Sequence, residues 1–342
     1  MEKIDENNQR MYHQFRAFPE LIREGIKIGE AFPAEPVKLR RIHWIGMGAS
    51  AIVGEYVEAY FEEKFGIEFR ISRIHRVAIF PHDDFWIFYS YSGNTSETIM
   101  AFNYVSSKTP TNKIMAVSSG GILEKEAKKK GIKHIKLKTG FVSRTHIPMG
   151  IAAVSIILGK ILGDVQSIHE DLQKCAGFVK KFMTKLEKKA DEVAKEISDD
   201  KMPILIAPYM FHPVLSYFEK TLNENTKRPA LTMILPEGLH NTICIFENYA
   251  SKLMAILLEW NNNDDLCSVY LNAFKRIASK FNIQIFSVEI PYNDFSFATL
   301  LLPTIFVGFL SVKLANKYHV DSYETKLILE AKNFVKKCVR NI

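Results

Sequence analysis

The sequence has few cysteines, and their arrangement does not indicate a metal or redox site. Of its 342 residues only Cys175, Cys244, Cys267 and Cys338 are cysteines, and no two of them are spaced as C-x-x-C, the spacing typical of zinc sites and redox pairs. Scattered cysteines in a chain of this length are typical of a reducing compartment. We therefore expect a cytoplasmic protein without a bound metal ion.

Signals for secretion, for a membrane and for nucleic acid are also missing. The first fifteen residues, MEKIDENNQRMYHQF, are charged and lack the apolar core of a signal peptide. The longest apolar stretch, 297–312, is shorter than the roughly 18 residues that cross a bilayer, so it predicts a buried helix. The formal net charge is +7, but the densest basic run, 180–195, also carries Glu187, Asp191 and Glu192. Such mixed charge indicates a solvated helix face, and we expect neither a membrane nor a nucleic acid as partner.

The chain is rich instead in hydrophobic residues, and segments that resemble strands alternate with segments that resemble helices. Hydrophobic residues make up 47% of it, and its length suggests two domains. Candidate strands such as RIHWI, WIFYS and KIMAV alternate with helical segments, and the alternation starts again at MPILIAP. This alternation predicts parallel βαβ units. We predict an α/β fold of two flavodoxin-like αβα sandwiches with mainly parallel sheets: a helical lead-in over 1–35, a first domain over 36–160, a linker helix over 161–200, and a second domain over 201–342 that ends in a helix.

The segment SYSGNTSET, Ser90 to Thr98, concentrates hydroxyl side chains at a predicted turn from a strand into a helix. Backbone N–H groups at a helix start are unpaired, and the helix dipole there favours an anion. Ser90, Ser92 and Thr95 add hydrogen-bond donors without adding charge, and Gly93 lets the backbone approach a ligand. The segment therefore predicts a phosphate-binding loop.

The segment GMGAS, Gly46 to Ser50, is a second turn from a strand into a helix. It lacks the third glycine of a dinucleotide fingerprint and the GK[ST] of a P-loop. Taken alone it fits a tight turn and a ligand cradle equally well. Both turns would open at one edge of the same parallel sheet, which is where open α/β folds bind their ligands.

GMGAS and SYSGNTSET resemble the sugar isomerase domain, the SIS domain, in which a loop of this form holds a sugar phosphate. FVSRTHIPMG, NENTKRPA, LPEGLHN and ETKLILEAK resemble the archaeal-type bifunctional phosphoglucose/phosphomannose isomerases. The matching elements run from about residue 40 to the end of the chain. The resemblance implies two SIS domains and no cofactor, with a phosphate site made of Gly48, Ser50, Ser90, Ser92 and Thr95.

The resemblance also implies three catalytic roles. Glu224, in NEN, would be the general base that moves a proton between C1 and C2 of the sugar. His240, in PEGLHN, would assist opening of the sugar ring, and it would reach the active site of the other subunit of a homodimer. Arg144 would stabilise the enediolate. The expected pattern is PExxHNE, and Thr242 stands where the second glutamate would be, which leaves the hydrogen bonding around His240 open.

Two further residues are assigned from the tail of the chain. Thr325 and Lys332 are predicted to lie on the last helix, and their seven-residue spacing is about two helical turns, so both would project from one face. The resemblance implies that Lys332 works with His240 in ring opening and that Thr325 lies near C2 and C3 of the sugar. Lys326 is a competing candidate for the lysine.

These residues together predict an aldose–ketose isomerase. It would interconvert glucose 6-phosphate, and also mannose 6-phosphate, with fructose 6-phosphate through a cis-enediol. The alternatives are a glucosamine-phosphate deaminase/isomerase and a non-enzymatic sugar-phosphate sensor. A sensor would use the serine loop but would not need Glu224, His240 and Lys332.

Overall fold

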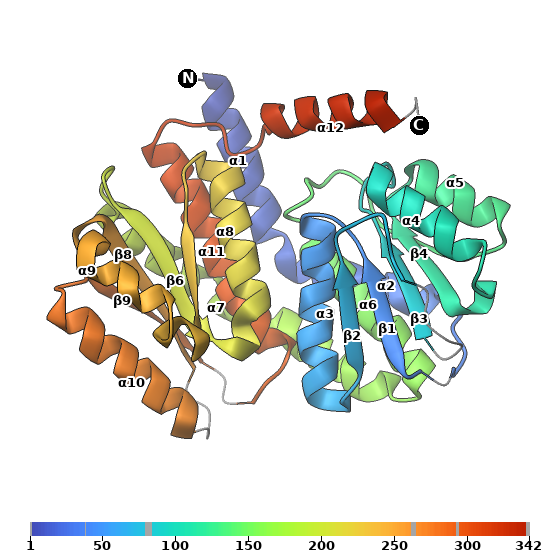
Figure 1. Cartoon of the computed structure of the whole chain (residues 1–342), viewed down its shortest axis with the longest axis horizontal. Helices are drawn as coiled ribbons and strands as arrows, with labels where there is room; N and C mark the ends of the chain where they lie inside the picture. The colour runs from blue at the N-terminus through green and yellow to red at the C-terminus, as the bar shows by residue number, and fades with distance from the viewer. Residues whose placement is uncertain (1, 38, 79–83, 261–264, 292–293, 340–342) are drawn as a thin grey trace. The chain divides into compact units, whose positions relative to one another are not determined.

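The computed structural model describes residues 2–37, 39–78, 84–260, 265–291 and 294–339 of the chain (Figure 1). Contacts between residues divide the chain into two compact units. Unit 1 comprises Met1–Pro19 and Lys174–Tyr323, and unit 2 comprises Glu20–Gln173 and Glu324–Ile342. Each unit holds one parallel sheet with helices on both faces, which confirms the predicted αβα architecture.

The sheet of unit 2 has its strands in the order β2-β1-β3-β4-β5, all parallel. The predicted strands RIHWI, WIFYS and KIMAV are its three inner members. They are buried almost throughout, because helices cover both faces of a doubly wound sheet. The strands are β1 (Arg41–Ile45), β2 (Glu68–Ser72), β3 (Asp84–Tyr89), β4 (Ile114–Ser118) and β5 (Lys133–Lys136).

Alternate side chains of these strands build two apolar layers. On one face, Trp86 and Phe88 pack with Phe102 of α4, and α5 joins the same layer. On the other face α3 packs against α6, and the ring of Trp44 lies against Gly54 of α3. The helices of this part of the chain are α2 (Phe18–Ala31), α3 (Ala49–Phe65), α4 (Ser96–Ser106), α5 (Gly121–Lys129), α6 (Ile147–Leu162) and α12 (Lys326–Val339).

The sheet of unit 1 has the order β7-β6-β8-β9 and is also parallel. Ile206 and Leu257 pack with Phe274 of α10 on one face, while α8 packs against both α11 and the strands of the sheet. Its strands are β6 (Met202–Pro208), β7 (Leu231–Leu235), β8 (Leu253–Trp260) and β9 (Ile285–Ile290), and the helices here are α1 (Glu2–Arg16), α7 (Val165–Glu196), α8 (His212–Thr226), α9 (Phe246–Tyr249), α10 (Asp265–Lys280) and α11 (Phe297–Lys317). Short 3-10 helices in the chain are η1 (Thr111–Lys113), η2 (Tyr209–Phe211), η3 (Glu237–Leu239), η4 (Thr242–Ile245) and η5 (Ala250–Lys252).

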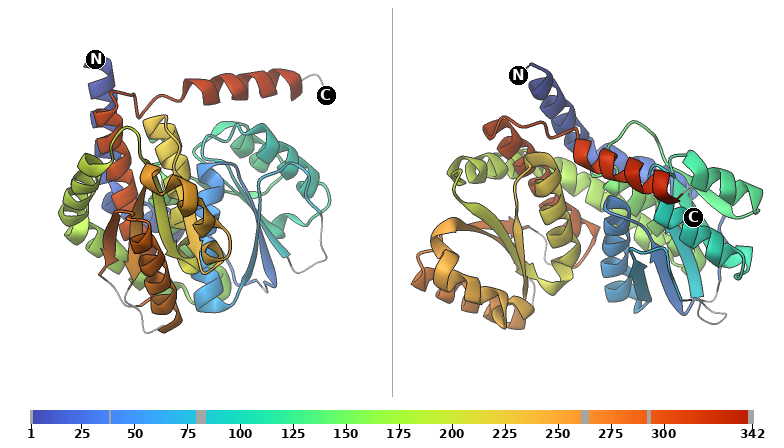
Figure 2. Two further views of the ribbon diagram at one scale, coloured as in Figure 1. Left: turned by 60° about the vertical axis from the view of Figure 1, so that its left-hand side comes forward. Right: turned by 45° about the horizontal axis from the view of Figure 1, so that its top comes forward.

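Helix α11 forms the centre of the helical layer of unit 1. It is long and apolar enough to cross a membrane by length and composition, yet 94% of its apolar window is buried inside the fold. It packs against α1 and α8, and Figure 2 shows α1 and α11 side by side. The expectation that 297–312 is a buried helix is therefore confirmed.

The predicted lead-in and linker are both helical. The lead-in 1–35 forms two helices: α1, which packs on α11, and α2, whose Gly25 lies against Met149 of α6. The predicted linker over 161–200 forms α7, which is separated from α6 by Gly163 in a left-handed conformation (φ 80°). Such a glycine ends a helix by satisfying its last carbonyls.

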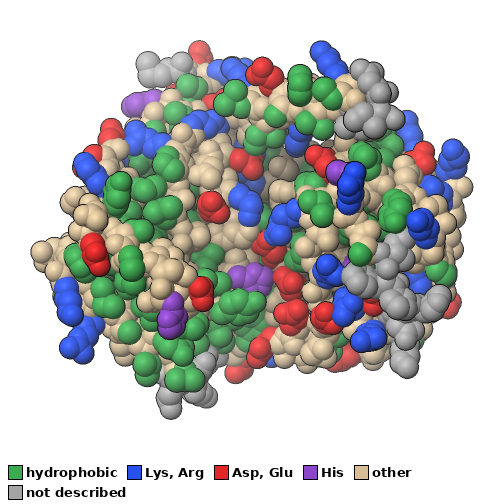
Figure 3. All heavy atoms as spheres, in the orientation of Figure 1, with side chains coloured by type: hydrophobic (Ala, Val, Ile, Leu, Met, Phe, Trp, Pro, Cys, Tyr) green, Lys and Arg blue, Asp and Glu red, His purple; other side chains and the backbone are tan. Residues whose placement is uncertain are grey.

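The basic run on α7 is accompanied by acidic side chains. Lys195 pairs with Asp191 at 2.6 Å, and Lys189 lies 3.6 Å from Glu192. On the face of the molecule seen in Figure 3, lysine and arginine side chains are interspersed with acidic ones among the described residues. The positive net charge is therefore distributed over this surface.

The contact between α3 and β1 yields a test of the packing in unit 2. A β-carbon on Gly54 would lie 2.7 Å from the buried ring of Trp44, whereas a β-carbon on Gly177 of α7 would enter open space. Gly54→Ala is expected to destabilise the fold by about 1–3 kcal/mol through overpacking. Gly177→Ala is expected to stabilise it by about 0.5–1 kcal/mol through helix propensity. Urea unfolding of both variants compares them, and equal shifts of the two midpoints would contradict this packing.

Candidate active site

The two glycine- and serine-rich turns meet at the point where the strand order of unit 2 reverses. The chain runs from β1 outward to β2 and returns to β3 on the other side of β1. The loops that follow β1 and β3 therefore open beside each other, which is where doubly wound sheets bind ligands. Ser50 Oγ accepts a hydrogen bond from the N–H of Tyr91 at 3.2 Å. The structure thus brings GMGAS and SYSGNTSET together, as the sequence predicted.

The hydroxyl groups of SYSGNTSET line the start of α4. Ser90 is 1% exposed, and its Oγ donates to Thr95 Oγ1 at 3.0 Å. Thr95 occupies the N-cap position of α4, but its side chain does not cap the helix. Ser92 is exposed, and its Oγ accepts from the N–H of Asn94 at 3.3 Å. Because no cap from Thr95 competes for them, the first N–H groups of α4 are available to an anion.

A third turn, Ser118 to Gly121 between β4 and α5, supports the phosphate loop, and the sequence analysis missed it. The N–H of Leu123 donates to Gly93 O at 2.9 Å, and the N–H of Ile122 donates to Asn94 Oδ1 at 3.2 Å. A β-carbon on Gly93, whose φ is +65°, would lie 1.7 Å from Gly120 O. The two turns therefore approach each other as closely as only glycine allows. The signal in the sequence was the dipeptide pair SSGG directly after a predicted strand.

Next to this turn, the buried Ser118 forms a hydrogen bond with the half-buried His134. Ser118 Oγ is 2.8 Å from His134 Nε2 on β5, and it donates to Gly120 O at 2.7 Å. Burial lowers the pKa of His134 to about 4, so the imidazole is neutral near pH 7. The pair fixes Gly120 against the phosphate loop and adds no charge there.

Arg144 lies in a segment that is fastened to the same loop. It is only 3% exposed, although most arginines lie at a protein surface. The hydroxyl of Tyr91 donates to Lys138 O at 3.0 Å and accepts from the N–H of Phe141 at 3.2 Å. The Tyr91 ring stacks on His146, with centroids 4.0 Å apart. Burial lowers the pKa of His146 to about 3, so this ring too is neutral.

The first helical residues after β1 depend on Gly48. Its φ of 54° and ψ of −127° place it in a region that residues with a β-carbon rarely adopt. Its conformation starts α3 and so positions Ser50, the second residue of that helix. Among the predicted site residues, unit 2 therefore brings together Gly48, Ser50, Ser90, Ser92, Thr95 and, through Tyr91, the segment of Arg144.

In unit 1, Glu224 lies in the segment before strand β7 and His240 lies in the segment after it. Glu224 lies near the end of α8, which precedes β7, and His240 follows β7 and η3. Five strand residues span roughly 13 Å from the first Cα to the last. The fold of unit 1 therefore does not bring the carboxylate and the imidazole of one chain together.

The end of α8 is tightly fixed around Glu224. Its neighbour Asn225 is 0% exposed, and Asn225 Nδ2 donates to Ser311 Oγ of α11 at 2.8 Å. Lys227 adopts a left-handed conformation at the end of the helix, and its Nζ donates to Glu224 O and to Asp321 O, each at 2.5 Å. Glu224 itself is half-buried. The NEN motif thus places a partly shielded carboxylate on a rigid helix end.

The hydrogen bonds of Asn241 show what Thr242 does in the turn that carries His240. Asn241 Oδ1 accepts from both the N–H and the hydroxyl of Thr242, and Asn241 Nδ2 donates to Glu237 Oε1 at 2.6 Å. The N–H of His240 donates to Glu237 O at 3.0 Å, and its side chain is exposed. The threonine therefore stabilises the turn, and His240 is exposed.

Of Thr325 and Lys332, only Lys332 lies on the last helix, as predicted. Thr325 is not on the last helix but directly before α12, and its C=O accepts from the N–H of Leu329 at 3.1 Å. Lys332 is exposed on α12. Lys326 is exposed too, and its Nζ lies 3.5 Å from Glu324. The choice between the two lysines stays a prediction.

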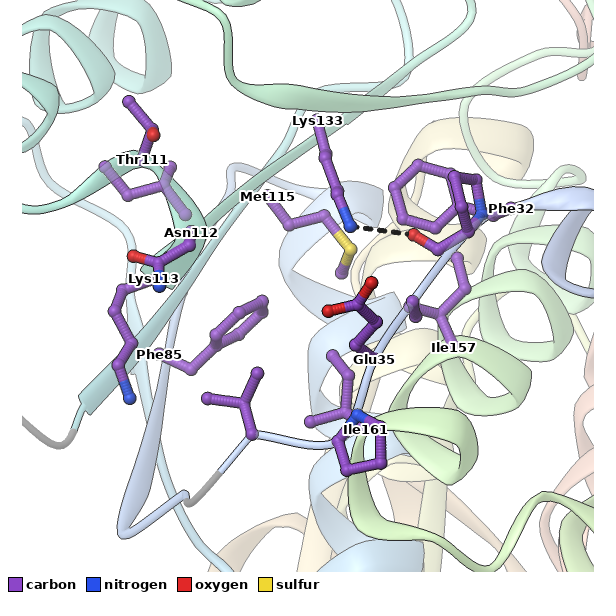
Figure 4. A pocket seen from close by; sticks show the side chains of 15 residues that line it. Phe32, Glu35, Phe85, Thr111, Asn112, Lys113, Met115, Lys133, Ile157 and Ile161 are labelled. Atoms are coloured by element: carbon purple, nitrogen blue, oxygen red, sulfur yellow. Dashed lines mark hydrogen bonds between the residues drawn. The ribbon is translucent and has the colours of Figure 1, made fainter.

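A cavity of about 450 Å³ lies at the other edge of the sheet of unit 2 (Figure 4). It is lined by the first residues of β3, β4 and β5 and by the extended segment after α2. Figure 4 shows the Glu35 carboxylate pointing into it and Lys133 Nζ bonded to Pro33 O, at 3.0 Å. Because it is at the amino ends of the strands, it does not belong to the phosphate loop.

Comparison with known proteins finds similarity to sugar isomerases. Residues 186–335 match the bacterial phospho-glucose isomerase C-terminal SIS domain. This part of the chain is therefore similar to a SIS domain of a sugar isomerase. A bifunctional phosphoglucose/phosphomannose isomerase of Aeropyrum pernix is 28% identical over 311 residues, which are 89% of this chain and 91% of that protein. A D-glucosamine-6-phosphate 4-epimerase of Sulfolobus acidocaldarius is 24% identical over 84% of this chain and 87% of its own length.

Solved structures show the same SIS fold. The C-terminal domain of glucosamine-fructose-6-phosphate aminotransferase from Francisella tularensis has a TM-score of 0.73 at 15% identity. The similarity covers 92% of this chain and 98% of that domain. The predicted pair of SIS domains is therefore confirmed as a fold.

The contact between Gly93 and Gly120 can be tested with a matched pair of glycines. Gly93 and Gly131 share a φ of +65°, but only a β-carbon on Gly93 would meet another atom. Gly93→Ala is expected to weaken binding of inorganic phosphate at least about tenfold by displacing the loop. Gly131→Ala is expected to cost only about 1 kcal/mol of stability. Calorimetric titration with phosphate measures both variants, and equal affinities would contradict the role given to this contact.

Proposed function

We propose that the protein interconverts glucose 6-phosphate and mannose 6-phosphate with fructose 6-phosphate. The observation that supports this most is the hydroxyl-lined turn of Ser90 to Thr95 at the reversal point of the sheet of unit 2. It offers N–H and O–H donors to a phosphate group. The similarity to a bifunctional phosphoglucose/phosphomannose isomerase along 89% of the chain agrees with this substrate class.

The proposed chemistry has three stages. The phosphate lies on the turns of Gly48–Ser50 and Ser90–Thr95, which holds the sugar in one orientation. His240 and the tail lysine assist opening of the ring by proton transfer. Glu224 then takes the proton from C2 of the open aldose and returns it at C1, by way of a cis-enediol.

Arg144 acts on the charge that develops between those proton transfers. Its segment is held to the phosphate loop through Tyr91 and Phe141, and its side chain is buried. A fixed guanidinium in a site shielded from water stabilises an enediolate far better than water does. Electrostatic stabilisation of the intermediate is therefore the role proposed for it.

We also propose a homodimer in which the two subunits share their active sites. Glu224 and His240 lie at opposite ends of β7, so the histidine of one chain is better placed to serve a neighbour than to serve its own glutamate. The exposed side chain of His240 agrees with this. The cytoplasmic location stays a prediction.

A second candidate is epimerisation at another carbon of a phosphosugar. The relative in Sulfolobus acidocaldarius that matches 84% of this chain is a D-glucosamine-6-phosphate 4-epimerase. An epimerase of that type would invert C4 and leave the aldehyde at C1. The deaminase alternative would release ammonia from an amino sugar, and a sensor would bind without turnover, so analysis of the products separates these activities.

The role of Glu224 is tested by removing its charge. Glu224→Gln keeps the shape of the side chain but cannot accept the C2 proton, so the rate is expected to fall by about 10² to 10⁴. Exchange of the C2 proton of glucose 6-phosphate with solvent deuterium, followed by NMR, reports that step directly. The matched control is Glu237→Gln, which changes a carboxylate bonded to Asn241. Normal exchange by Glu224→Gln together with lost exchange by Glu237→Gln would move the base to Glu237.

The shared site is tested by complementation. Glu224→Gln and His240→Ala chains should each be inactive alone, and a mixture that has exchanged subunits should regain roughly a quarter of the wild-type activity. The reason is that one of the two sites in each mixed dimer collects both intact residues. Native mass spectrometry establishes that exchange has occurred. Mixed dimers that show no activity would rule out the shared site.

A further inference from the structure

Asn8, on α1, is a buried amide whose hydrogen-bonding capacity is fully used by the end of α11 and the turn that follows it. It is 1% exposed. Its Nδ2 donates to Asn316 Oδ1 at 2.8 Å and to Val320 O at 3.1 Å. Its Oδ1 accepts from the N–H of Ser322 at 2.8 Å and from the Ser322 hydroxyl at 2.6 Å. Two donors and two acceptor sites are all that an asparagine side chain offers.

The same turn has further contacts with α1. Asn7 Nδ2 donates to Asp321 Oδ2 at 2.7 Å, and Asp321 Oδ1 accepts from the N–H of Tyr323 at 2.8 Å. The guanidinium of Arg10 lies over the ring of Tyr323, 4.4 Å from its centroid. Three residues within one turn of α1 therefore hold the segment Val320–Tyr323.

The turn also joins the end of α8. Lys227 Nζ donates both to Asp321 O and to Glu224 O. Since Ser311 on α11 holds Asn225, the backbone of Glu224 and the turn belong to one hydrogen-bonded structure. Thr325 follows Ser322 by three residues, and α12 with Lys332 starts immediately afterwards.

We infer that Asn8 is a positioning residue. By holding the turn Val320–Ser322 it fixes the point at which the tail with Thr325 and Lys332 begins, and Lys227 joins this turn to the end of α8, next to Glu224. The inference rests on the proposed function, because it is the proposed roles of these residues that make their placement matter. We call the four hydrogen bonds of the Asn8 side chain the clamp. Burial makes the clamp strong, since leaving a buried amide without hydrogen-bond partners costs free energy of folding. The amino-terminal helix is thereby part of the catalytic arrangement without touching the substrate.

The experiment compares Asn8→Ala with Met11→Ala, which removes a side chain of 0% exposure from the same helix and leaves the clamp intact. Both variants should lower the melting temperature. Only Asn8→Ala should lower kcat for both sugar phosphates, by about tenfold or more, because small misplacements of reacting groups are expensive in rate. Its affinity for inorganic phosphate should remain unchanged, since the phosphate loop belongs to unit 2. The double variant Asn8→Ala with Ser322→Ala should lose no more than Asn8→Ala alone.

Amide hydrogen exchange over residues 320–335, measured in the same samples well below the melting temperature, tests the clamp independently of activity. Exchange that is faster in Asn8→Ala than in Met11→Ala, together with the loss of kcat, supports the inference. Unchanged exchange overturns the clamp, and faster exchange with normal kcat overturns its role in positioning. A wild-type protein that lacks isomerase activity would contradict the proposed function. The amide hydrogen exchange would still decide whether Asn8 holds the turn.

Discussion

The reversal of strand order beside β1 is the constraint on which the proposed phosphate site depends. Because β2 and β3 pair with opposite edges of β1, the helices that follow β1 and β3 lie on opposite faces of the sheet, and their first turns open toward the same space. The starts of α3 and α4 then face one volume, and at α4 no side chain caps the first N–H groups. The bond from the N–H of Tyr91 to Ser50 Oγ fixes the distance between them.

The rest of unit 2 keeps this arrangement rigid. Gly93 and Gly120 approach too closely for any side chain, and the neutral pair of Ser118 and His134 supports the contact from below. Tyr91 connects the loop to the segment of Arg144 by two hydrogen bonds and a stacked ring. In the proposed phosphate site, backbone dipoles and hydroxyl groups would supply the attraction for the anion.

The fold and the meeting of the two turns could be predicted from sequence because they depend on local patterns. Apolar segments that alternate with helical ones identified RIHWI, WIFYS and KIMAV as strands, and the hydroxyl cluster marked the helix start at Thr95. The support from Ser118 to Gly121 was missed because a contact between two loops leaves no periodic signal in either. Asn8 was missed for the same reason: a polar residue near the start of an otherwise charged helix reads as exposed, and only its partners 308 to 314 residues away reveal its burial. Thr325 was placed on the helix instead of before it, because a sequence pattern locates the end of a helix only to within one or two residues.

The most direct test of the proposed isomerisation is the fate of fructose 6-phosphate incubated with the wild-type protein in deuterium oxide and followed by NMR. We expect glucose 6-phosphate and mannose 6-phosphate, each carrying deuterium at C2, because a carboxylate that exchanges with solvent moves the proton. Failure to convert the ketose, or a product changed at C4 with C1 and C2 untouched, would contradict it.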